Sequence, residues 1–553
     1  MKRLAAHELP SHLDLPLDSI VRCWTTSHWA YILFRGRLEN DTFTETRHGK
    51  QSARTIITGH IMILSIDQGT TGTTAFVFDS RGAQIGYSYA EISNYYPKPG
   101  WVEQNAEEIW QITLSVCSAA LERAGIRASD IQAVGITNQR ETTILWDRHT
   151  GEPVHPAIVW QCRRSAEICA ELVAAGNSQW LRERSGLLLD AYFSASKLLW
   201  LFRQNPKLLA RARSGALCFG TMDSWLIWKM SGGRAHLTDH TNASRTLLYN
   251  LAQKHWDPEL LALFDCPESI LPEIRPSASY FTDTDPKAFL GTDAPICGVA
   301  GDQQAALFGQ GCIHPGDIKN TYGTGCFMLA FAGEMPPALP QGLLATVACD
   351  VHGAPAYAVE GSVFTAGSAV QWLRDELGLI QQAAETEIIA QSIPDTRGVY
   401  LVPAFSGLGA PHWNPLARGT ICGLSRGAGR AELVRATLES IAYQSDELVR
   451  LMSEALDLPI SHMRVDGGAS VNNFLMQFQA DISALRVERP RQIESTAIGA
   501  ALLAGIGSGL WQSRRLPECL KEIDRDFLPA MAAPKRESLL AGWKRAVSAC
   551  QAF

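Results

Sequence analysis

From residue 62 onwards, short apolar runs of strand length alternate with stretches of helical periodicity. The segments 63–66, 75–78 and 131–136 are apolar runs that end at polar or turn-forming residues. The segments 107–123 and 430–456 have the helical repeat. In the second of these, the apolar positions on one face are Val434, Leu438, Ile441, Leu448 and Met452. This alternation predicts an α/β protein.

A strand–turn–strand pattern occurs twice, at points far apart in the chain. It spans 63–78 around a Gly- and Thr-rich turn, and it returns at 317–330 around Thr-Tyr-Gly-Thr-Gly at 321–325. Two related halves that each present such a hairpin would place a nucleotide in the cleft between them. The sequence therefore predicts two related α/β halves with a nucleotide site between them.

Residues 1–61 differ from the rest of the chain. They have mixed charges and scattered Trp and His, but no sustained period of either 2 or 3.6. The strand pattern begins directly after Met62. We expect residues 1–61 to be an N-terminal extension that is poorly ordered, with a small accessory segment as the alternative.

Composition and charge exclude several classes of protein. The formal net charge is −7 and no stripe of Lys and Arg is present, which argues against a nucleic-acid partner. The 13 cysteines are scattered without a Cys-x-x-Cys pair, which is typical of a reducing compartment rather than of a zinc ribbon or a disulfide framework. No apolar run reaches the ~18 residues that a membrane span needs. We expect a cytoplasmic protein with no stable membrane anchor.

The first hairpin turn has the composition of a phosphate-binding loop. Residues 67–74 read Asp-Gln-Gly-Thr-Thr-Gly-Thr-Thr, and the sequence lacks the Gly-Lys-Ser/Thr of a Walker loop there. Backbone N–H groups beside Gly69 and the Thr hydroxyls suit phosphate oxygens, and Asp67 is placed to hold Mg²⁺. The alternative is a hairpin with no ligand.

Asp302 has two interpretations from sequence alone. The stretch Gly-Asp-Gln-Gln at 301–304 precedes an apolar helical segment, so Asp302 lies where a helix N-cap would lie. Alternatively, Asp302 is a carboxylate base for a substrate hydroxyl, with Gln303 as its polar neighbour.

Further candidates follow strands or are aromatic. Arg140 and Glu141 come at the carboxyl end of a strand, where α/β sheets bind ligands, and together suit vicinal hydroxyls. A surface ion pair is the alternative. Gly467 and Gly468 also end a strand and allow close approach to a base or a phosphate. Three aromatic residues are taken individually as core residues, namely Trp160, Tyr192 and Phe327.

Read in order, these segments resemble the FGGY family of carbohydrate kinases. The matches include Asp-Gln-Gly-Thr-Thr at 67–71, Gly-Asp-Gln-Gln at 301–304 and Asp-Gly-Gly-Ala at 466–469. Further matching stretches are 136–143, 159–164, 241–246, 304–309, 320–328 and 402–411. The resemblance runs from about Met62 to the C-terminus and leaves residues 1–61 unexplained.

The resemblance implies a fold and an activity. The fold is a pair of actin-like (ribonuclease H-like) α/β domains flanking a catalytic cleft, here 62–311 and 312–553. The activity is ATP- and Mg²⁺-dependent phosphorylation of glycerol to sn-glycerol 3-phosphate by a homo-oligomer, either a dimer or a tetramer. The alternatives are a family member that acts on another polyol or sugar, and an ATP-driven interaction protein similar to actin or the heat-shock chaperones.

The resemblance also implies roles for individual residues. Asp302 is the implied general base, and Asp67 and Asp302 are the implied metal ligands. Similar enzymes usually carry Arg where this chain has Thr74. Residues implied to bind the polyol are Arg140, Glu141, Trp160, Tyr192, Asp302, Gln303 and Phe327. Residues implied to line the ATP site are Thr70, Thr71, Gly72, Thr324, Gly367, Gln371, Gly468 and Asn472.

Overall fold

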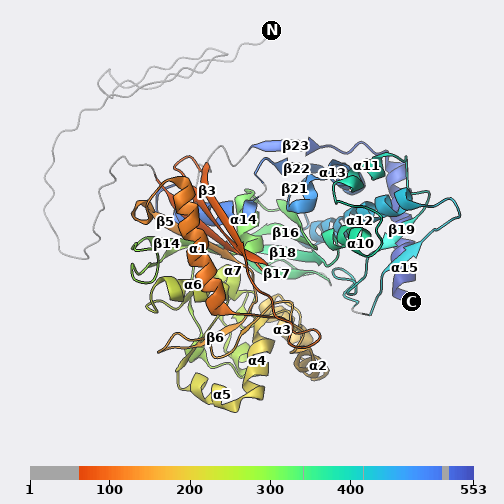
Figure 1. Ribbon diagram of the computed structural model, residues 1–553. Helices are drawn as coiled ribbons and strands as arrows, with labels where there is room; N and C mark the ends of the chain where they lie inside the picture. The colour runs from red at the N-terminus through yellow and green to blue at the C-terminus, as the bar shows by residue number, and fades with distance from the viewer. Residues whose placement is uncertain (1–60, 340–341, 415, 493, 513–521, 553) are drawn as a thin grey trace, which may run out of the picture. The chain divides into compact units, whose positions relative to one another are not determined.

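The computed structural model describes residues 61–339, 342–414, 416–492, 494–512 and 522–552 (Figure 1). The expected N-terminal extension, residues 1–61, lies outside the described residues apart from Ile61. The α/β class is confirmed, because a six-stranded and a seven-stranded sheet are each covered by helices.

The six-stranded sheet is built around the first predicted hairpin. Its central strand β1 pairs antiparallel with β2 and parallel with β5. Side chains of β1 alternate between the two faces, so that Leu64 and Ile66 pack near α1 while the Ser65 hydroxyl donates to the carbonyl of Ala497 in α14 at 2.7 Å. In spatial order the strands are β13 (Ala278–Asp283), β14 (Pro295–Gly301), β5 (Ala133–Asn138), β1 (Ile63–Gln68), β2 (Gly72–Phe78) and β3 (Gln84–Glu91).

The seven-stranded sheet repeats this arrangement. Its hairpin strands β15 and β16 are antiparallel, β16 continues to an antiparallel β18, and β15 is parallel to β21. The order β18-β16-β15-β21 thus corresponds to β3-β2-β1-β5, which confirms the predicted repeat. In spatial order the strands are β17 (Leu344–Cys349), β18 (Pro355–Val363), β16 (Cys326–Gly333), β15 (Ile318–Tyr322), β21 (His462–Asp466), β22 (Arg486–Pro490) and β23 (Ile523–Phe527).

Long helices pack on the two sheets at the predicted places. Residues 107–123 fall within α1 (Ala106–Ala124), which packs on the first sheet, and α12 (Arg430–Leu456) matches the other predicted helix and packs on the second. The first sheet is covered on its other face by α14 (Ser495–Gly507), although α14 follows the second sheet in the chain. This close packing requires glycine, since a Cβ at Gly135 would lie 2.3 Å from the Ala500 carbonyl oxygen.

The remaining elements surround the two sheets. Figure 1 shows α2 to α5 gathered together in the yellow and brown part of the ribbon. No helix in the described ranges is long and apolar enough to cross a membrane. The other helices are α2 (Ala166–Ala174), α3 (Ser178–Ser185), α4 (Ser194–Gln204), α5 (Pro206–Arg213), α6 (Met222–Met230), α7 (His240–Ala243), α8 (Pro258–Leu263), α9 (Asp302–Gly309), α10 (Gly367–Asp375), α11 (Glu385–Gln391), α13 (Asn473–Ser483) and α15 (Ala533–Ala552). The short strands are β4 (Glu103–Gln104), β6 (Ile144–Asp147), β7 (Ala157–Ile158), β8 (Leu217–Gly220), β9 (Leu237–Asp239), β10 (Tyr249–Asn250), β11 (His255–Trp256), β12 (Glu273–Arg275), β19 (Tyr400–Val402) and β20 (Thr420–Cys422).

Candidate active site

Arg140 follows the carboxyl end of β5 and is buried between the two sheets. Its Nη1 and Nη2 donate to the two carboxylate oxygens of Glu360 on β18, at 2.7 and 3.0 Å. Its Nε lies 3.1 Å from Oδ1 of Asp302, at the start of α9. Because Arg140 and Glu141 are only 3% and 1% exposed, the surface ion pair considered for them is wrong.

Glu141 is held in a strained turn beside Arg140. Its φ is +60°, and the turn is closed by Thr142 N–H donating to the Arg140 carbonyl at 2.7 Å. Its carboxylate accepts from Arg245 Nε at 2.6 Å, and Arg245 Nη2 donates to Glu360 at 3.0 Å. Burial raises the pKa of Glu141 despite the two guanidinium groups. The turn therefore directs a carboxylate into the interior, where arginines hold it.

Glu360 is the shared partner of both arginines. Burial favours its neutral form, but Arg140 and Arg245 outweigh that effect and lower the pKa of Glu360 to about 2. The two buried carboxylates and the two guanidinium groups balance one another in charge, which is the condition under which buried ions are tolerated, and Arg140 links this network to Asp302.

Asp302 does not cap α9. The N-cap position is occupied by Gly301, and Asp302 is the first helical residue, with its Oδ1 accepting from the adjacent Gln303 N–H at 2.7 Å. The capping interpretation is therefore wrong. The side chain of Asp302 keeps 31% of its surface exposed while it contacts the Arg140 guanidinium. Asp302 therefore presents an accessible carboxylate whose orientation is fixed by an arginine.

Three aromatic rings from separate segments meet near these charges. The ring of Trp160 makes edge contacts with Tyr192 at 5.5 Å and with Phe327 at 6.4 Å between centroids. All three side chains stay partly exposed, which differs from the core role considered for each alone. Trp160 Nε1 also donates to the Thr70 hydroxyl at 2.8 Å. The rings and the first hairpin turn are therefore joined directly.

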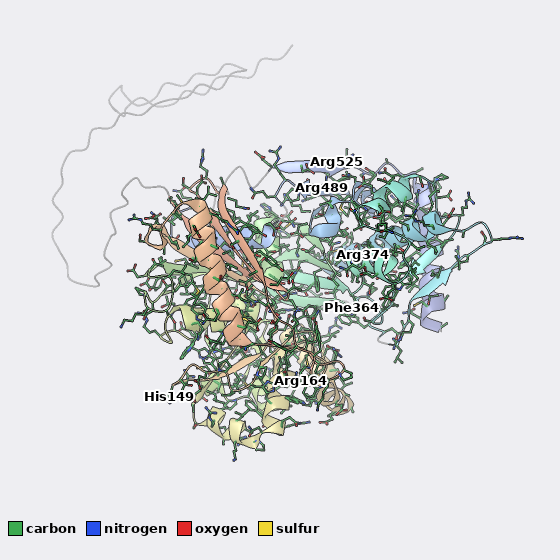
Figure 2. All side chains as sticks on the ribbon, in the orientation of Figure 1. His149, Arg164, Phe364, Arg374, Arg489 and Arg525 are labelled. Atoms are coloured by element: carbon green, nitrogen blue, oxygen red, sulfur yellow. The ribbon has the colours of Figure 1, made fainter. Side chains whose placement is uncertain are left out.

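Arg164 anchors the segment that carries Trp160. Its guanidinium, labelled in Figure 2, lies 4.0 Å from the ring centroid of Trp101 and 5.0 Å from that of Trp200. It also forms a 2.7 Å ion pair with Glu103. Stacked and paired in this way, Arg164 fixes the loop after β7, on which Trp160 is carried.

Each hairpin turn is closed by a hydrogen bond from a glycine N–H to a glycine carbonyl, three residues further on in the first turn and two residues further on in the second. In the first, Gly69 N–H donates to the Gly72 carbonyl at 2.9 Å, and in the second Gly323 N–H donates to the Gly325 carbonyl at 2.9 Å. Thr70 and Thr71 lie in the first turn and Thr324 in the second. Each turn thus presents an exposed Thr side chain, Thr71 in the first turn and Thr324 in the second.

The other expected nucleotide residues lie on segments around the second turn. Gly367 N–H donates to the Gly323 carbonyl at 3.0 Å at the start of α10, and Gln371 is exposed one turn further along this helix. Gly468 is exposed, and a Cβ added at this glycine would have no atom within 4 Å, so the space beside it is open. The Asn472 amide is already engaged, because its Oδ1 caps α13 and its Nδ2 donates to the Thr386 hydroxyl at 3.1 Å.

Asp67 lies at the end of β1 in an acidic environment. Burial raises its pKa to about 8, and the carboxylates of Asp302 and Glu494 add to the effect. Thr74 is its direct partner in the β1–β2 ladder, so the two side chains share one face of the sheet. The residue paired with Asp67 is therefore a neutral threonine and not a positively charged side chain.

Sequence reasoning missed three charged residues of this region. Arg245 lies within a recognised stretch but received no role, and Glu360 and Lys319 were not selected. A charge inside an otherwise apolar strand is the available signal, since Glu360 and Lys319 both interrupt β-strand sequences and are 0% exposed. That signal identifies a buried charge but not its partner.

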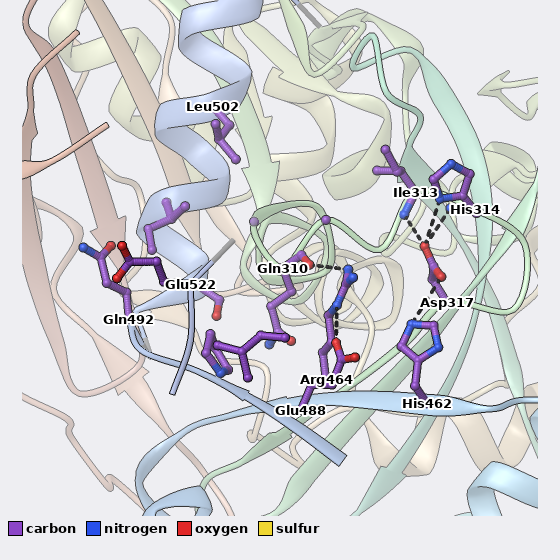
Figure 3. Close-up of a pocket in the computed structure, with 16 residues that line it drawn as sticks. Gln310, Ile313, His314, Asp317, His462, Arg464, Glu488, Gln492, Leu502 and Glu522 are labelled. Atoms are coloured by element: carbon purple, nitrogen blue, oxygen red, sulfur yellow. Dashed lines mark hydrogen bonds and ion pairs between the residues drawn. The ribbon is translucent and has the colours of Figure 1, made fainter. Parts of the chain in front are cut away.

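A separate cavity of about 440 Å³ lies between α14 and strands β21 and β22. Figure 3 shows Asp317 between His314 and His462, at 3.4 and 3.6 Å, and Arg464 bonded to the Gln310 carbonyl and the Glu488 carboxylate. None of the sequence-predicted site residues lines it.

Comparison with known proteins decides the family. Residues 62–309 match the model of the FGGY family of carbohydrate kinases, N-terminal domain, and residues 318–508 match that of the C-terminal domain. The chain belongs to the FGGY family of carbohydrate kinases. The two-domain actin-like α/β fold that the resemblance implied is thereby confirmed for this FGGY chain.

Curated relatives and a crystal structure agree with the family assignment. The chain is 52% identical over 485 residues to a glycerol kinase of Symbiobacterium thermophilum, covering 88% of this chain and 97% of that one. It is 51% identical over 486 residues to glycerol kinase 2 of Thermotoga maritima, covering 88% and 98%. The crystal structure of Plasmodium falciparum glycerol kinase with ADP superposes with a TM-score of 0.83 at 35% identity, covering 89% and 98%.

Proposed function

We infer that this chain is an enzyme that transfers the γ-phosphoryl group of ATP to glycerol, giving ADP and sn-glycerol 3-phosphate. The observation that carries this inference is the identity of about half of all positions, over 88% of the chain, to proteins named glycerol kinase. The accessible carboxylate of Asp302, held beside Arg140, supplies the group that such a transfer requires.

We propose that Asp302 is the general base. As the glycerol hydroxyl oxygen forms its bond to the γ-phosphorus, the hydroxyl proton passes to the Asp302 carboxylate, and the bond from phosphorus to the bridging oxygen of ADP breaks. Phosphoryl transfer depends mainly on positioning and charge stabilisation, so the part required of the protein is a base and a rigid polar site. Arg140 keeps the carboxylate oriented through the 3.1 Å contact to its Oδ1.

The polyol would lie between the charged network and the aromatic rings. The residues proposed to bind its hydroxyls are Arg140, Glu141, Tyr192 and Gln303. Trp160 and Phe327 are proposed to flank its carbon chain. Trp160 and Phe327 pack edge to face with their centroids 6.4 Å apart, so together they form an apolar wall beside the charged network.

ATP would lie along the two hairpin turns and their neighbours. The residues proposed to line the ATP site are Thr70, Thr71, Gly72, Thr324, Gly367, Gln371, Gly468 and Asn472. Asn472 would contribute its backbone, because its side-chain amide is already hydrogen-bonded. Mg²⁺ fits the carboxylates of Asp67 and Asp302, since a cation would favour the charged form of Asp67, and when bound it would supply charge stabilisation to the phosphate oxygens. The homo-oligomer and the cytoplasmic location stay predictions.

An acceptor panel tests the function. A coupled ADP-release assay with glycerol, dihydroxyacetone, erythritol, xylulose and no acceptor is expected to give the highest kcat/KM for glycerol. We expect it to exceed that for xylulose by about 100-fold, because a longer chain cannot make the same contacts with the packed aromatic rings and with Asp302. A higher kcat/KM for any other acceptor would show that the chain is a family member that acts on that acceptor instead of glycerol. Acceptor-independent ATP hydrolysis at the same rate would contradict kinase function.

Thr74→Arg is expected to lower KM for ATP by about three- to tenfold. An arginine at this position would lie on the face of Asp67, where similar enzymes carry one, and would place a guanidinium beside the phosphate oxygens, a strong charge-assisted contact. Thr74→Gln is the matched control, because it adds length without charge. Initial rates at varied ATP measure the effect, and equal KM values for the Arg and Gln variants would contradict the argument.

A further inference from the structure

Lys319 is a buried ammonium that joins the two domains. It lies on β15 of the second sheet and is 0% exposed. Its Nζ donates to Oε1 of Gln303 at 2.5 Å and to the Thr321 hydroxyl at 2.7 Å. Gln303 belongs to α9 of the first domain, and Thr321 is on the same face of β15, just before the second hairpin turn. Lys319 therefore connects the proposed polyol side with the proposed nucleotide side.

The partners of Lys319 are not those expected for a stabilising ion pair. Within the described ranges, no carboxylate comes within 4.0 Å of its Nζ, whereas the buried Arg245 pairs with both Glu141 and Glu360. Burial lowers the pKa of Lys319, the carboxylates of Asp466 and Asp302 oppose this shift, and the Arg140 guanidinium adds to it. A buried ammonium with two neutral acceptors is a net cost to stability. Its placement is better explained by what it does to Gln303.

Lys319 determines which way round the Gln303 carboxamide lies. An ammonium group can only donate hydrogen bonds, so it must be met by the amide oxygen and not by the amide nitrogen. The Nε2 of Gln303 has no hydrogen-bond partner among the described residues, and the side chain is partly exposed. The amide N–H groups are thus left for a ligand that offers an acceptor oxygen.

We propose that Lys319 is a positioning residue for the acceptor substrate: it locks the Gln303 carboxamide so that Nε2 donates to a hydroxyl oxygen of the polyol. This rests on the assignment of Gln303 to the polyol made above. Without the ammonium, the amide can rotate and present its oxygen instead, and the donor is lost for part of the time. Lys319 thereby favours substrates that carry an oxygen at the carbon facing Gln303.

Lys319→Met tests the proposal. KM for glycerol is expected to rise about tenfold, the equivalent of one hydrogen bond, while kcat and KM for ATP change less than about threefold. The melting temperature is expected to stay the same or rise, because methionine fills the space without a buried charge. A structural role would instead lower the melting temperature and alter all three kinetic constants together. Lys254→Met is the matched control, since Lys254 Nζ is bonded to the Pro355 carbonyl and touches no site residue.

Gln303→Met and the double variant separate the possible outcomes. If Lys319 acts through Gln303, the double variant has the same KM for glycerol as Gln303→Met alone. If Gln303→Met leaves KM for glycerol unchanged, the assignment of Gln303 to the polyol fails. If Gln303→Met raises KM but Lys319→Met does not, only the inference about Lys319 is overturned. If the methionine variant is insoluble, Lys319→Gln replaces it, because a neutral amide no longer fixes the orientation of the Gln303 carboxamide. We then expect KM for glycerol to rise at least threefold.

Discussion

Asp302→Asn is expected to lower kcat by about 10²–10⁴-fold, the usual contribution of a general base. The amide keeps the shape of the side chain and can still accept from Arg140, but it cannot take the proton of the attacking hydroxyl. Stability should change by about 1 kcal/mol or less, because Asp302 does not cap α9 and is one partner among several of Arg140. KM for glycerol is also expected to rise, since Asp302 would bind the hydroxyl that it deprotonates.

The matched control for Asp302→Asn is a true helix cap. Asp257 caps α8, with its Oδ1 accepting from the backbone N–H groups of Glu259 and Leu260, and it lies outside the site. Asn still caps the helix through Oδ1, but its NH2 group would replace the Oδ2 that accepts from Asn250 at 2.7 Å and pairs with Arg184 at 2.9 Å. Asp257→Asn should therefore lower the melting temperature and leave kcat near the parent value. If Asp302 is the base, Asp302→Asn lowers kcat with little change in melting temperature, whereas Asp257→Asn lowers the melting temperature with little change in kcat. An Asp302→Asn enzyme that turns over glycerol within a few-fold of the parent would remove Asp302 from the mechanism.

The elements around the site follow from local sequence patterns. The repeated hairpin at 63–78 and 317–330 predicts both sheet centres, because strand–turn–strand signals are local and the same topology follows each. The helices at 107–123 and 430–456 follow from the helical spacing of their apolar residues. Asp67, Asp302 and the Thr residues of the turns are candidates for the same reason, since each ends a strand, directly follows one or lies in a turn.

The charged network was not predictable, because its contacts join distant parts of the chain. Arg140 and Glu360 are 220 positions apart, and no period or spacing links them. The alternatives left open for Arg140 and Glu141 depended on burial, which the sequence does not give for a single pair. The same holds for α14, which follows the second sheet in sequence but packs on the first. Long-range packing decided these features, and local propensity did not.

Glu360→Gln is expected to cost about 3 kcal/mol of stability at neutral pH. Arg140 and Arg245 hold the pKa of Glu360 at about 2, against an ordinary 4.5, and each pKa unit corresponds to about 1.4 kcal/mol. A glutamine offers one acceptor oxygen where two guanidinium groups now meet two, so positive charge stays buried without its partner. Arg140 would then lose the bidentate partner that holds it against Asp302, so Asp302 would be less well positioned and kcat should fall by about tenfold.

The pH dependence of stability gives Glu360→Gln a specific signature. Because the folded pKa of Glu360 is depressed, its contribution is fully present above about pH 4.5 and is lost as the pH falls towards 2. The difference in melting temperature between the parent and Glu360→Gln should therefore be constant from pH 8 to pH 5 and narrow below that. Glu273→Gln is the matched control, because Glu273 forms a 2.9 Å pair with Arg275 on the surface, and such pairs contribute about 1 kcal/mol at most. A Glu360→Gln protein as stable as this control would show that the two arginines do not depend on Glu360, and the network would then not be what holds Arg140 against Asp302.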